Sequence, residues 1–295
     1  MDYKASEDFI YRNARLLDFL RYRFLFQHGS AEDVLAVLSR YQNSDGGFGH
    51  ALECDCFNPD SSPMATWKAT TIIRETGVTK HEVIDGLLSY LDSGASFDGC
   101  LWDLTVPSNN DWPHAPWWNH VEGVRSWNPT AALAGFIITY ADRGSSVYRK
   151  AETIIGKAIE YFFSSAPLES MHTACCFVSL YEDLVRVGYD FDRKKFRPLL
   201  SEQIRHLVSH DPSVWETEYS AKPSLFISSR KSEFLAGNEE IIRSECAFIR
   251  RTQCHDGSWA VNWNWETYPE TWPLAEHFWK SQIIIRNLAF LKEFS

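Results

Sequence analysis

The sequence predicts an all-α fold in which antiparallel helical hairpins close into a ring. Over most of the 295 residues, apolar side chains recur at three- and four-residue steps, and no alternating pattern typical of a strand is found. The segments 42–48 and 253–259 also share the pattern Gln-x-x-Asp-Gly-x-aromatic, each at the end of a helical pattern. Such a repeat near both ends of a chain is typical of closed rings of helix pairs. We therefore expect one α/α toroid domain over residues 1–295.

The individual helices follow from this periodicity and from their start and stop signals. Residues 6–27 carry an apolar stripe, and Ser30 is a suitable cap for the next helix. Proline is favourable in the first helical turn, so Pro63, Pro129 and Pro223 each indicate a helix start, whereas Gly77 indicates an end. Besides the helix that starts at Pro223, the pattern predicts helices over 6–27, 31–42, 63–75, 80–93, 129–141, 146–164, 169–188, 192–209, 237–253 and 272–293.

Long and short connections alternate along the chain. A long connection follows every second helix. The long connections cover residues 43–62, 94–127, 210–222 and 254–271. Inner and outer helices of such a ring are antiparallel, so connections of the same kind emerge on the same rim. We therefore expect these four loops to surround one mouth.

Composition limits the function classes. Aromatic residues make up 15% of the chain, and several of the 12 Trp fall in loops, which favours an aromatic cavity. The net charge of −10 and the lack of a long basic cluster argue against a nucleic-acid partner. We find neither a signal segment nor an apolar run long enough to span a membrane, and the 7 Cys lack the spacing of a disulfide scaffold. The prediction is a soluble, cytoplasmic protein with reduced thiols.

The repeated turn resembles a known family. The pattern at 42–48 and 253–259, followed by a Thr-containing helix, resembles the QW-type repeats of terpenoid cyclases and the equivalent repeats of protein prenyltransferase beta subunits. Residues 128–133 resemble a third inner-helix start of this kind, and the chain resembles a group of bacterial prenyltransferase-like proteins. The resemblance implies an α/α toroid that acts on an isoprenoid-type substrate. Asp45 and Asp256 themselves are expected to be structural, because an Asp-Gly pair usually caps a turn.

The family's catalytic motifs are largely missing. Neither the Asp-x-Asp-Asp acid of class II cyclases nor the Asp-Asp-x-x-Asp magnesium motif of class I synthases is found. The zinc ligands of protein prenyltransferases have a partial counterpart in Asp98, Cys100 and His172, which occur in the family's order. Zinc binds these ligand types in an open three-ligand site. The alternative is that Asp98 belongs to a further Asp-Gly turn and that His172 lies at a helix start. No cofactor is otherwise expected.

Glu53 and Asp55 are the candidate acid and base. Two carboxylates in one pocket split their pKa values into one acid and one base, which allows protonation of an alkene or a glycosidic oxygen. We expect them to face Asp111 and His114 from the loop 94–127, which form a second acid/base pair. The alternative is a solvated acidic loop that caps the helix at Pro63.

The remaining candidate residues are expected to line the mouth and bind substrate, because they lie in the long Trp-rich loops. These residues are Asn58, Asn109, Asn110, Trp117, Trp118, Glu216, Trp263, Trp265 and Glu266. The alternative is that the loops form a lid whose Trp residues pack as its core. Basic residues near the mouth are few, which counts against a diphosphate substrate.

Three function classes follow. The first is an enzyme that acts on an isoprenoid-type small molecule, with Trp walls that stabilise a carbocation. The second is a carbohydrate-active enzyme of the (α/α)6 type, whose paired carboxylates flank a sugar held on Trp faces. The third is a non-catalytic binding module that uses the ring as a scaffold.

Overall fold

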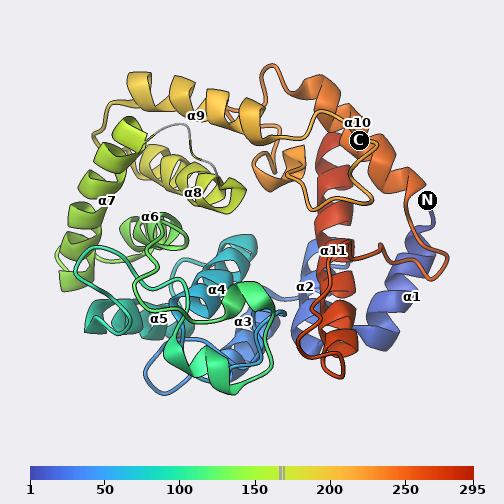
Figure 1. The fold of residues 1–295 in the computed structure, drawn as a ribbon, viewed down its shortest axis with the longest axis horizontal. Helices are drawn as coiled ribbons and strands as arrows, with labels where there is room; N and C mark the ends of the chain where they lie inside the picture. The colour runs from blue at the N-terminus through green and yellow to red at the C-terminus, as the bar shows by residue number, and fades with distance from the viewer. Residues whose placement is uncertain (166–167, 169) are drawn as a thin grey trace. The chain divides into compact units, whose positions relative to one another are not determined.

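The computed structural model describes residues 1–165, 168 and 170–295 of the chain (Figure 1). Within these residues it contains 11 α-helices and no strand, which confirms the all-α class. The helices are α1 (Tyr3–Asn13), α2 (Leu16–Phe26), α3 (Ala31–Leu38), α4 (Pro63–Thr76), α5 (Glu82–Ser93), α6 (Thr130–Tyr140), α7 (Ser146–Ser165), α8 (Met171–Val187), α9 (Arg193–Leu207), α10 (Glu239–Arg251) and α11 (Trp272–Phe294).

The chain divides into two compact units. Unit 1 comprises Met1–Val37 and Ile204–Ser295, and unit 2 comprises Leu38–Gln203. The helices α3 and α9 each pass from one unit to the other. The single toroid domain expected from the sequence stays a prediction.

Most helix starts and ends agree with the sequence signals. Ser62 caps α4 by accepting the Ala65 N–H at 3.1 Å, with Pro63 in the first turn, and Gly77 ends this helix at φ 71°. Gly188 ends α8 in the same way, at φ 66°. The short hydroxyl and glycine signals therefore fix these boundaries locally.

Two predicted helices are wrong. Residues 6–27 form two helices, because the backbone of Ala14 is extended and the Asn13 amide donates back to the Phe9 carbonyl at 3.0 Å. Such a side-chain bond competes with continuation of the helix. The helix expected from Pro223 is only the 3-10 turn η4 (Pro223–Leu225), whose following residues return to irregular backbone.

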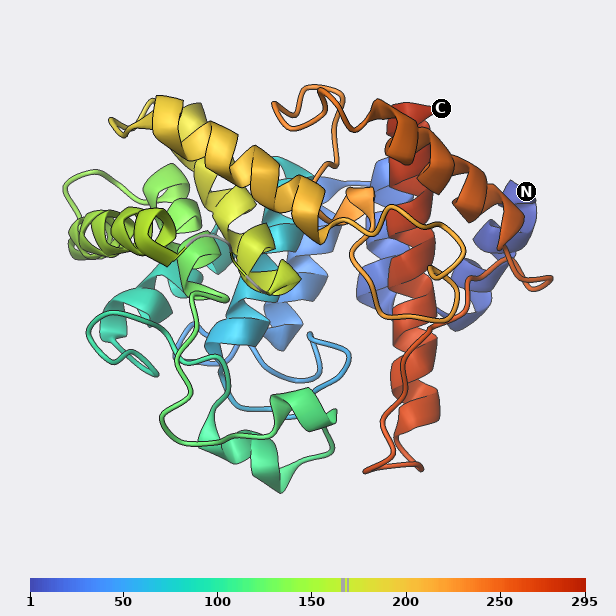
Figure 2. The ribbon, with the colours of Figure 1, turned by 45° about the horizontal axis from the view of Figure 1, so that its top comes forward.

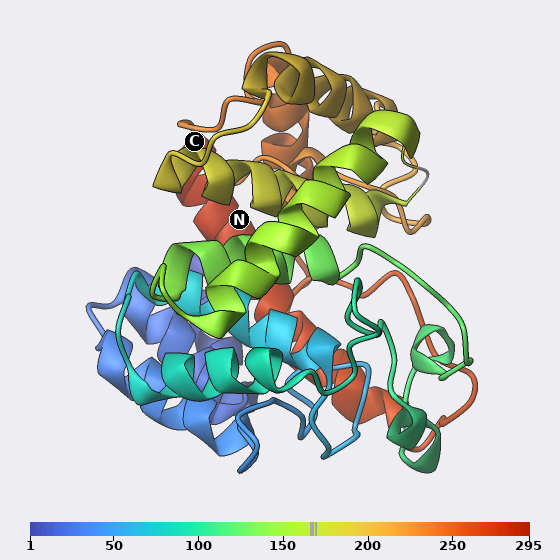
Figure 3. The same ribbon diagram turned by 90° about the vertical axis from the view of Figure 1, so that its left-hand side faces the viewer.

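Unit 2 is organised around α6. All residues from Thr130 to Ile138 are buried, and α4, α7 and α8 pack against this helix (Figure 3). The guanidinium of Arg74 on α4 donates to both carboxylate oxygens of Asp183 on α8, at 2.6 and 2.7 Å. The ion pair passes close to α6, because a Cβ on Gly135 would lie 2.6 Å from Asp183 Oδ2. Because residue 135 is glycine, α6 leaves room for this two-pronged ion pair between α4 and α8.

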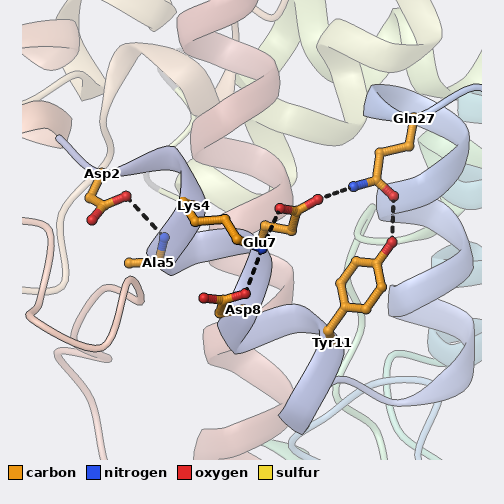
Figure 4. Close-up of polar contacts among 7 residues, drawn as sticks. All are labelled: Asp2, Lys4, Ala5, Glu7, Asp8, Tyr11 and Gln27. Atoms are coloured by element: carbon orange, nitrogen blue, oxygen red, sulfur yellow. Dashed lines mark hydrogen bonds and ion pairs between the residues drawn. The ribbon is translucent and has the colours of Figure 1, made fainter.

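Unit 1 brings the two ends of the chain together. The helix α11 contacts α1, α2 and α10, and the Ser6 hydroxyl donates to the Gly257 carbonyl at 2.6 Å. Two side chains of α1 bond Gln27 at the end of α2 (Figure 4). The Gln27 amide donates to the Glu7 carboxylate, and the Tyr11 hydroxyl donates to Gln27 Oε1 at 2.8 Å. These bonds fix the α1–α2 hairpin on its exposed side.

The Asp-Gly turn at 42–48 is bonded to α5 within unit 2. The Gln42 amide donates to the carbonyls of Gly46, at 2.9 Å, and of Val83 in the first turn of α5, at 3.0 Å. Asp45 accepts the Gly47 N–H and the Ser61 hydroxyl, at 2.9 and 2.7 Å. The turn is therefore bonded both to itself and to the next helix.

The turn at 253–259 makes the same contacts in unit 1. The Gln253 amide donates to the carbonyl of Asp2, the cap of α1, at 2.8 Å, and its oxygen accepts the Asp2 N–H at 2.6 Å. Asp256 accepts the Ser258 N–H at 3.0 Å. In both turns, the Gln side chain thus bonds the start of the adjacent helix.

Glycine is required in both turns. Gly46 and Gly257 have φ of 88° and 86°, where only glycine is free of strain. A Cβ on Gly46 would lie 2.0 Å from the Gly86 carbonyl oxygen, and one on Gly257 would lie 2.1 Å from the Ala5 carbonyl carbon. The backbone of each turn therefore lies directly against a neighbouring helix.

We expect Gly46→Ala and Gly257→Ala each to lower the free energy of unfolding by more than about 3 kcal/mol, because backbone strain and a backbone clash add. Gly156→Ala is the control. Gly156 lies on the exposed side of α7 with nothing within 4 Å, and alanine there should add about 0.5–1 kcal/mol. Urea denaturation measures all three, and a loss below about 1 kcal/mol in either turn variant would show that the turn can shift without cost.

Candidate functional site

Two of the long loops join in unit 2. Residues 55–57 pair with 113–115 in antiparallel register, through Phe57 N–H to Pro113 O at 2.9 Å and Ala115 N–H to Asp55 O at 2.8 Å (Figure 2). Cys56 and His114 therefore lie directly opposite each other, and at such a pair the two side chains project from the same face. The pairing brings the candidate acid/base loop next to the Trp-rich loop, as expected.

An amide network ties the same two loops side chain to side chain. The Asn58 amide donates to Ser108 Oγ and to Asn109 Oδ1, both at 2.9 Å. The Asn109 amide in turn donates to the Trp118 carbonyl at 2.9 Å. Both asparagines are 3% exposed. A buried amide without a hydrogen-bond partner is costly in free energy, so these bonds stabilise the arrangement. The network holds residues 107–118 in place over the acidic loop.

The carboxylates of Glu53 and Asp55 are buried beneath this cover. They are 7% and 3% exposed, although charged side chains are rarely buried without a specific role or partner. Glu53 borders a cavity of about 10 Å³, the size at which a single water molecule fits. The cavity is lined by Gly49, Leu52, Glu53, Cys56, Asn58, Ser62, Met64, Ala65, Asn109 and Trp118.

Cys56 and Ser108 belong to this site although the sequence did not single them out. The Cys56 thiol lies 3.5 Å from Asn109 Oδ1. Burial, together with the charges of the nearby Glu53 and Asp55, raises the pKa of this thiol to about 12. A thiol in this state is not a nucleophile at neutral pH. The only sequence signal was the spacing Glu53-Cys54-Asp55-Cys56, which alternates acid and thiol.

The expected Asp111–His114 pair lies only partly within the site. His114 is 6% exposed and its Nδ1–H donates to the Trp112 carbonyl at 2.6 Å, which fixes the tautomer. Asp111 is exposed at the end of the 3-10 turn η2 (Pro107–Asp111). Asn110 and Trp117 are also exposed, and Asn110 bonds the His120 backbone. These three side chains thus lie on the outer surface of the cover.

The three zinc candidates are not brought together. Among the described residues, no group of three His, Cys, Asp or Glu side chains could hold a metal ion. Asp98 accepts the N–H groups of Cys100 and Leu101, both at 2.8 Å, and pairs with Arg125 at 2.8 Å. It thus serves an Asp-Gly turn, with Gly99 at φ 91°. His172 is exposed in the first turn of α8.

The candidates in unit 1 divide into core and surface. Trp265 is 1% exposed and packs edge-on against Trp272, with ring centroids 5.6 Å apart, so it is a core residue rather than a substrate contact. Trp263 is half-buried between Tyr219 and Trp279. Glu216 and Glu266 are exposed, and Glu216 lies 3.7 Å from Arg251.

Comparison with protein-family models, curated proteins and solved structures finds no match for this chain. None of the described helices is both long and apolar enough to span a bilayer. The functional interpretation therefore depends on the geometry of the site.

The state of Cys56 gives a direct test of the site geometry. We expect iodoacetamide at pH 8 to alkylate the exposed Cys254 quickly and Cys56 slowly, because a thiol of pKa about 12 is only ~0.01% thiolate at that pH. Raising the pH to 9 should increase the rate at Cys56 about tenfold while keeping the thiolate a small minority. Mass spectrometry of the tryptic peptides measures both rates. Equal rates at the two cysteines would contradict the buried, tied arrangement of the loops.

Proposed function

We propose that this chain is an enzyme that performs acid–base chemistry with Glu53 and Asp55. The burial of both carboxylates, two residues apart in one loop, carries the proposal. Burial of a charged group opposes folding, and acidic pairs with distinct environments are how enzymes obtain one acid and one base. One carboxyl group would donate a proton to the substrate, and the other would accept one.

The proposed scaffold is an α/α toroid. The matching turns support it, because Gln42 and Gln253 bond adjacent helices in the same way in the two units. The turn at Asp98 adds further support. There the Trp102 N–H donates to Thr130 Oγ1 at 2.9 Å, as the Phe48 N–H does to Thr66 Oγ1 at 3.2 Å.

An isoprenoid-type substrate is the first candidate, from the resemblance of these turns to terpenoid cyclase repeats. A buried carboxylic acid would protonate an alkene, and the Trp118 ring would face the resulting cation. The cavity lining contains neither Lys nor Arg. This composition favours a reaction that starts by proton transfer rather than by loss of a diphosphate.

A carbohydrate is the second candidate, and the polar lining of the cavity favours it. The amides of Asn58 and Asn109 lie beside Glu53, and amides and carboxylates are suitable partners for sugar hydroxyls. The indole N–H of Trp118 is buried and has no acceptor among the described residues. A hydroxyl oxygen of a ligand would provide that acceptor.

Either substrate requires residues 107–118 to move, because the cavity fits only one water molecule. The cover is held by the two backbone bonds to residues 55–57 and by the side-chain bonds of Asn58 and Asn109, so movement requires these bonds to open. Movement of a loop over an active site is a common step in catalysis and excludes bulk water when the loop closes.

The test is a thermal-shift panel followed by product analysis. Linear terpene alkenes and polyprenols form one arm, and neutral oligosaccharides form the other. A ligand at one hundred times its dissociation constant adds about 2.7 kcal/mol to the stability. We expect one arm to stabilise the protein and its ligands to be converted, and we expect the double variant Glu53→Gln/Asp55→Asn to keep the shift but lose at least ~1000-fold in turnover.

Asp60→Asn is the matched control, because Asp60 is exposed in the same loop, and it should keep full turnover. Turnover that persists in the double variant would overturn the assignment of the acid and base. A thermal shift without conversion would overturn the enzyme proposal in favour of a binding module. The absence of a shift in both arms would overturn both substrate candidates.

A further inference from the structure

Unit 1 contains a second cluster of charged side chains, away from any residue discussed as acid or base. Glu245 on α10 is 1% exposed and accepts the Ser224 N–H at 2.8 Å as well as the Ser224 hydroxyl. Burial raises the pKa of Glu245, while the bonds from Ser224 and the charges of Arg286 and Lys222 oppose this rise. Both carboxylate oxygens are thus already engaged by Ser224.

Two cations interact electrostatically with this carboxylate. Lys222 precedes the turn η4, and Arg286 lies on α11. Desolvation lowers the pKa of both, and the charge of Arg286 lowers the pKa of Lys222 further. The Lys222 ammonium lies 5.6 Å from the centre of the Phe248 ring. The cluster therefore carries one positive charge more than it can neutralise.

Arg286 is the unusual member. Within the described part of the chain, its guanidinium forms neither a hydrogen bond nor a close ion pair, although the charge of Glu245 acts on it. The side chain is exposed to solvent, although neighbouring protein atoms lower its pKa. An exposed guanidinium is open to a ligand, and its planar fork suits a bound oxyanion.

An aromatic wall continues from the cationic end along α11. Trp279 and Arg286 are seven residues apart, which places them two turns or about 10 Å apart on one helix face. Trp263 packs between Tyr219 and Trp279, with ring centroids 5.5 and 5.2 Å apart. Tyr219 also interacts electrostatically with Arg286. The wall and the cations are therefore parts of one surface.

The indole N–H of Trp263 gives an independent indication of a ligand. It is buried and has no acceptor among the described residues. A buried donor without an acceptor costs about 1–3 kcal/mol, and a polar ligand atom would satisfy it.

We propose that this surface binds a ligand with an oxyanion group and an apolar or aromatic body. Arg286 and Lys222 hold the oxyanion, and Tyr219, Trp263 and Trp279 contact the body. The net charge of the cluster fits one negative charge, as on a carboxylate or a singly charged phosphate ester. This site lies in unit 1 and does not depend on the acid and base proposed in unit 2.

Calorimetry with four probes tests the proposal. The probes are 4-phenylbutyrate, the singly charged diester methyl 3-phenylpropyl phosphate, the neutral 4-phenylbutanol and inorganic phosphate alone. We expect at least one oxyanion probe to bind at least tenfold more tightly than the alcohol and to quench tryptophan fluorescence. The carboxylate and phosphate arms identify which oxyanion is preferred.

Arg286→Gln should weaken binding of the preferred probe at least tenfold, while Arg243→Gln, an exposed position on α10, should leave it unchanged. The ligand-free Arg286→Gln protein should melt at the same temperature as the parent or higher, because the variant removes an unpaired charge. A lower melting temperature with unchanged probe affinity would assign Arg286 a structural role and overturn the proposal. Equal affinity for the alcohol and both oxyanions would overturn it as well.

Discussion

The close approach of a turn to a neighbouring helix is the constraint on which the rest of this structure depends. Gly46 and Gly257 place their backbones where a Cβ would lie about 2 Å from backbone atoms of the adjacent segment. The Gln and Asp side chains of the same turns then bond the start of that segment and the turn itself. Each turn therefore fixes the direction of the chain that follows, and in unit 2 that chain is the acidic loop with Glu53 and Asp55.

The charged side chains inside this protein occur in two arrangements, pairs of opposite charge and groups of like charge. Arg74 and Asp183 satisfy each other through two short bonds, so their pair joins helices without an excess of charge. Glu53 and Asp55 place two like charges in one buried loop, and Lys222 and Arg286 place two like charges beside one carboxylate. Like charges held together oppose folding. We interpret the two carboxylates as the acid and base of the proposed enzyme, and the two cations as the proposed binding site for an oxyanion.

The sequence predicted the elements that depend on local chemistry. Ser62 with Pro63, and Gly77, mark the ends of α4 because their capping bonds lie within a few residues. The interruption at Ala14 escaped prediction, because the apolar stripe continues through it while the Asn13 side chain bonds back to Phe9. The periodicity of a stripe does not report a competing side-chain bond.

The candidate site was predicted in part for a similar reason. Asn58 and Asn109 were expected on the same rim from the alternation of the loops, and the structure joins them by a hydrogen bond of 2.9 Å. Whether a loop Trp is core or surface depends instead on tertiary packing, which makes Trp265 buried and Trp117 exposed. Arg286 escaped notice because it lies within a long helix, and its lack of a partner becomes visible only when α10, η4 and α11 are placed together.

The central claim is that Glu53 and Asp55 are buried for catalysis and not for stability. The most direct measurement is the free energy of unfolding of Glu53→Gln/Asp55→Asn relative to the parent protein, from urea denaturation at pH 7. The amides keep the shape and an acceptor oxygen of each side chain, so charges that serve catalysis and not stability leave the free energy of unfolding close to that of the parent. A loss of more than about 3 kcal/mol would contradict the account, because it would show that the two charges hold the loop together.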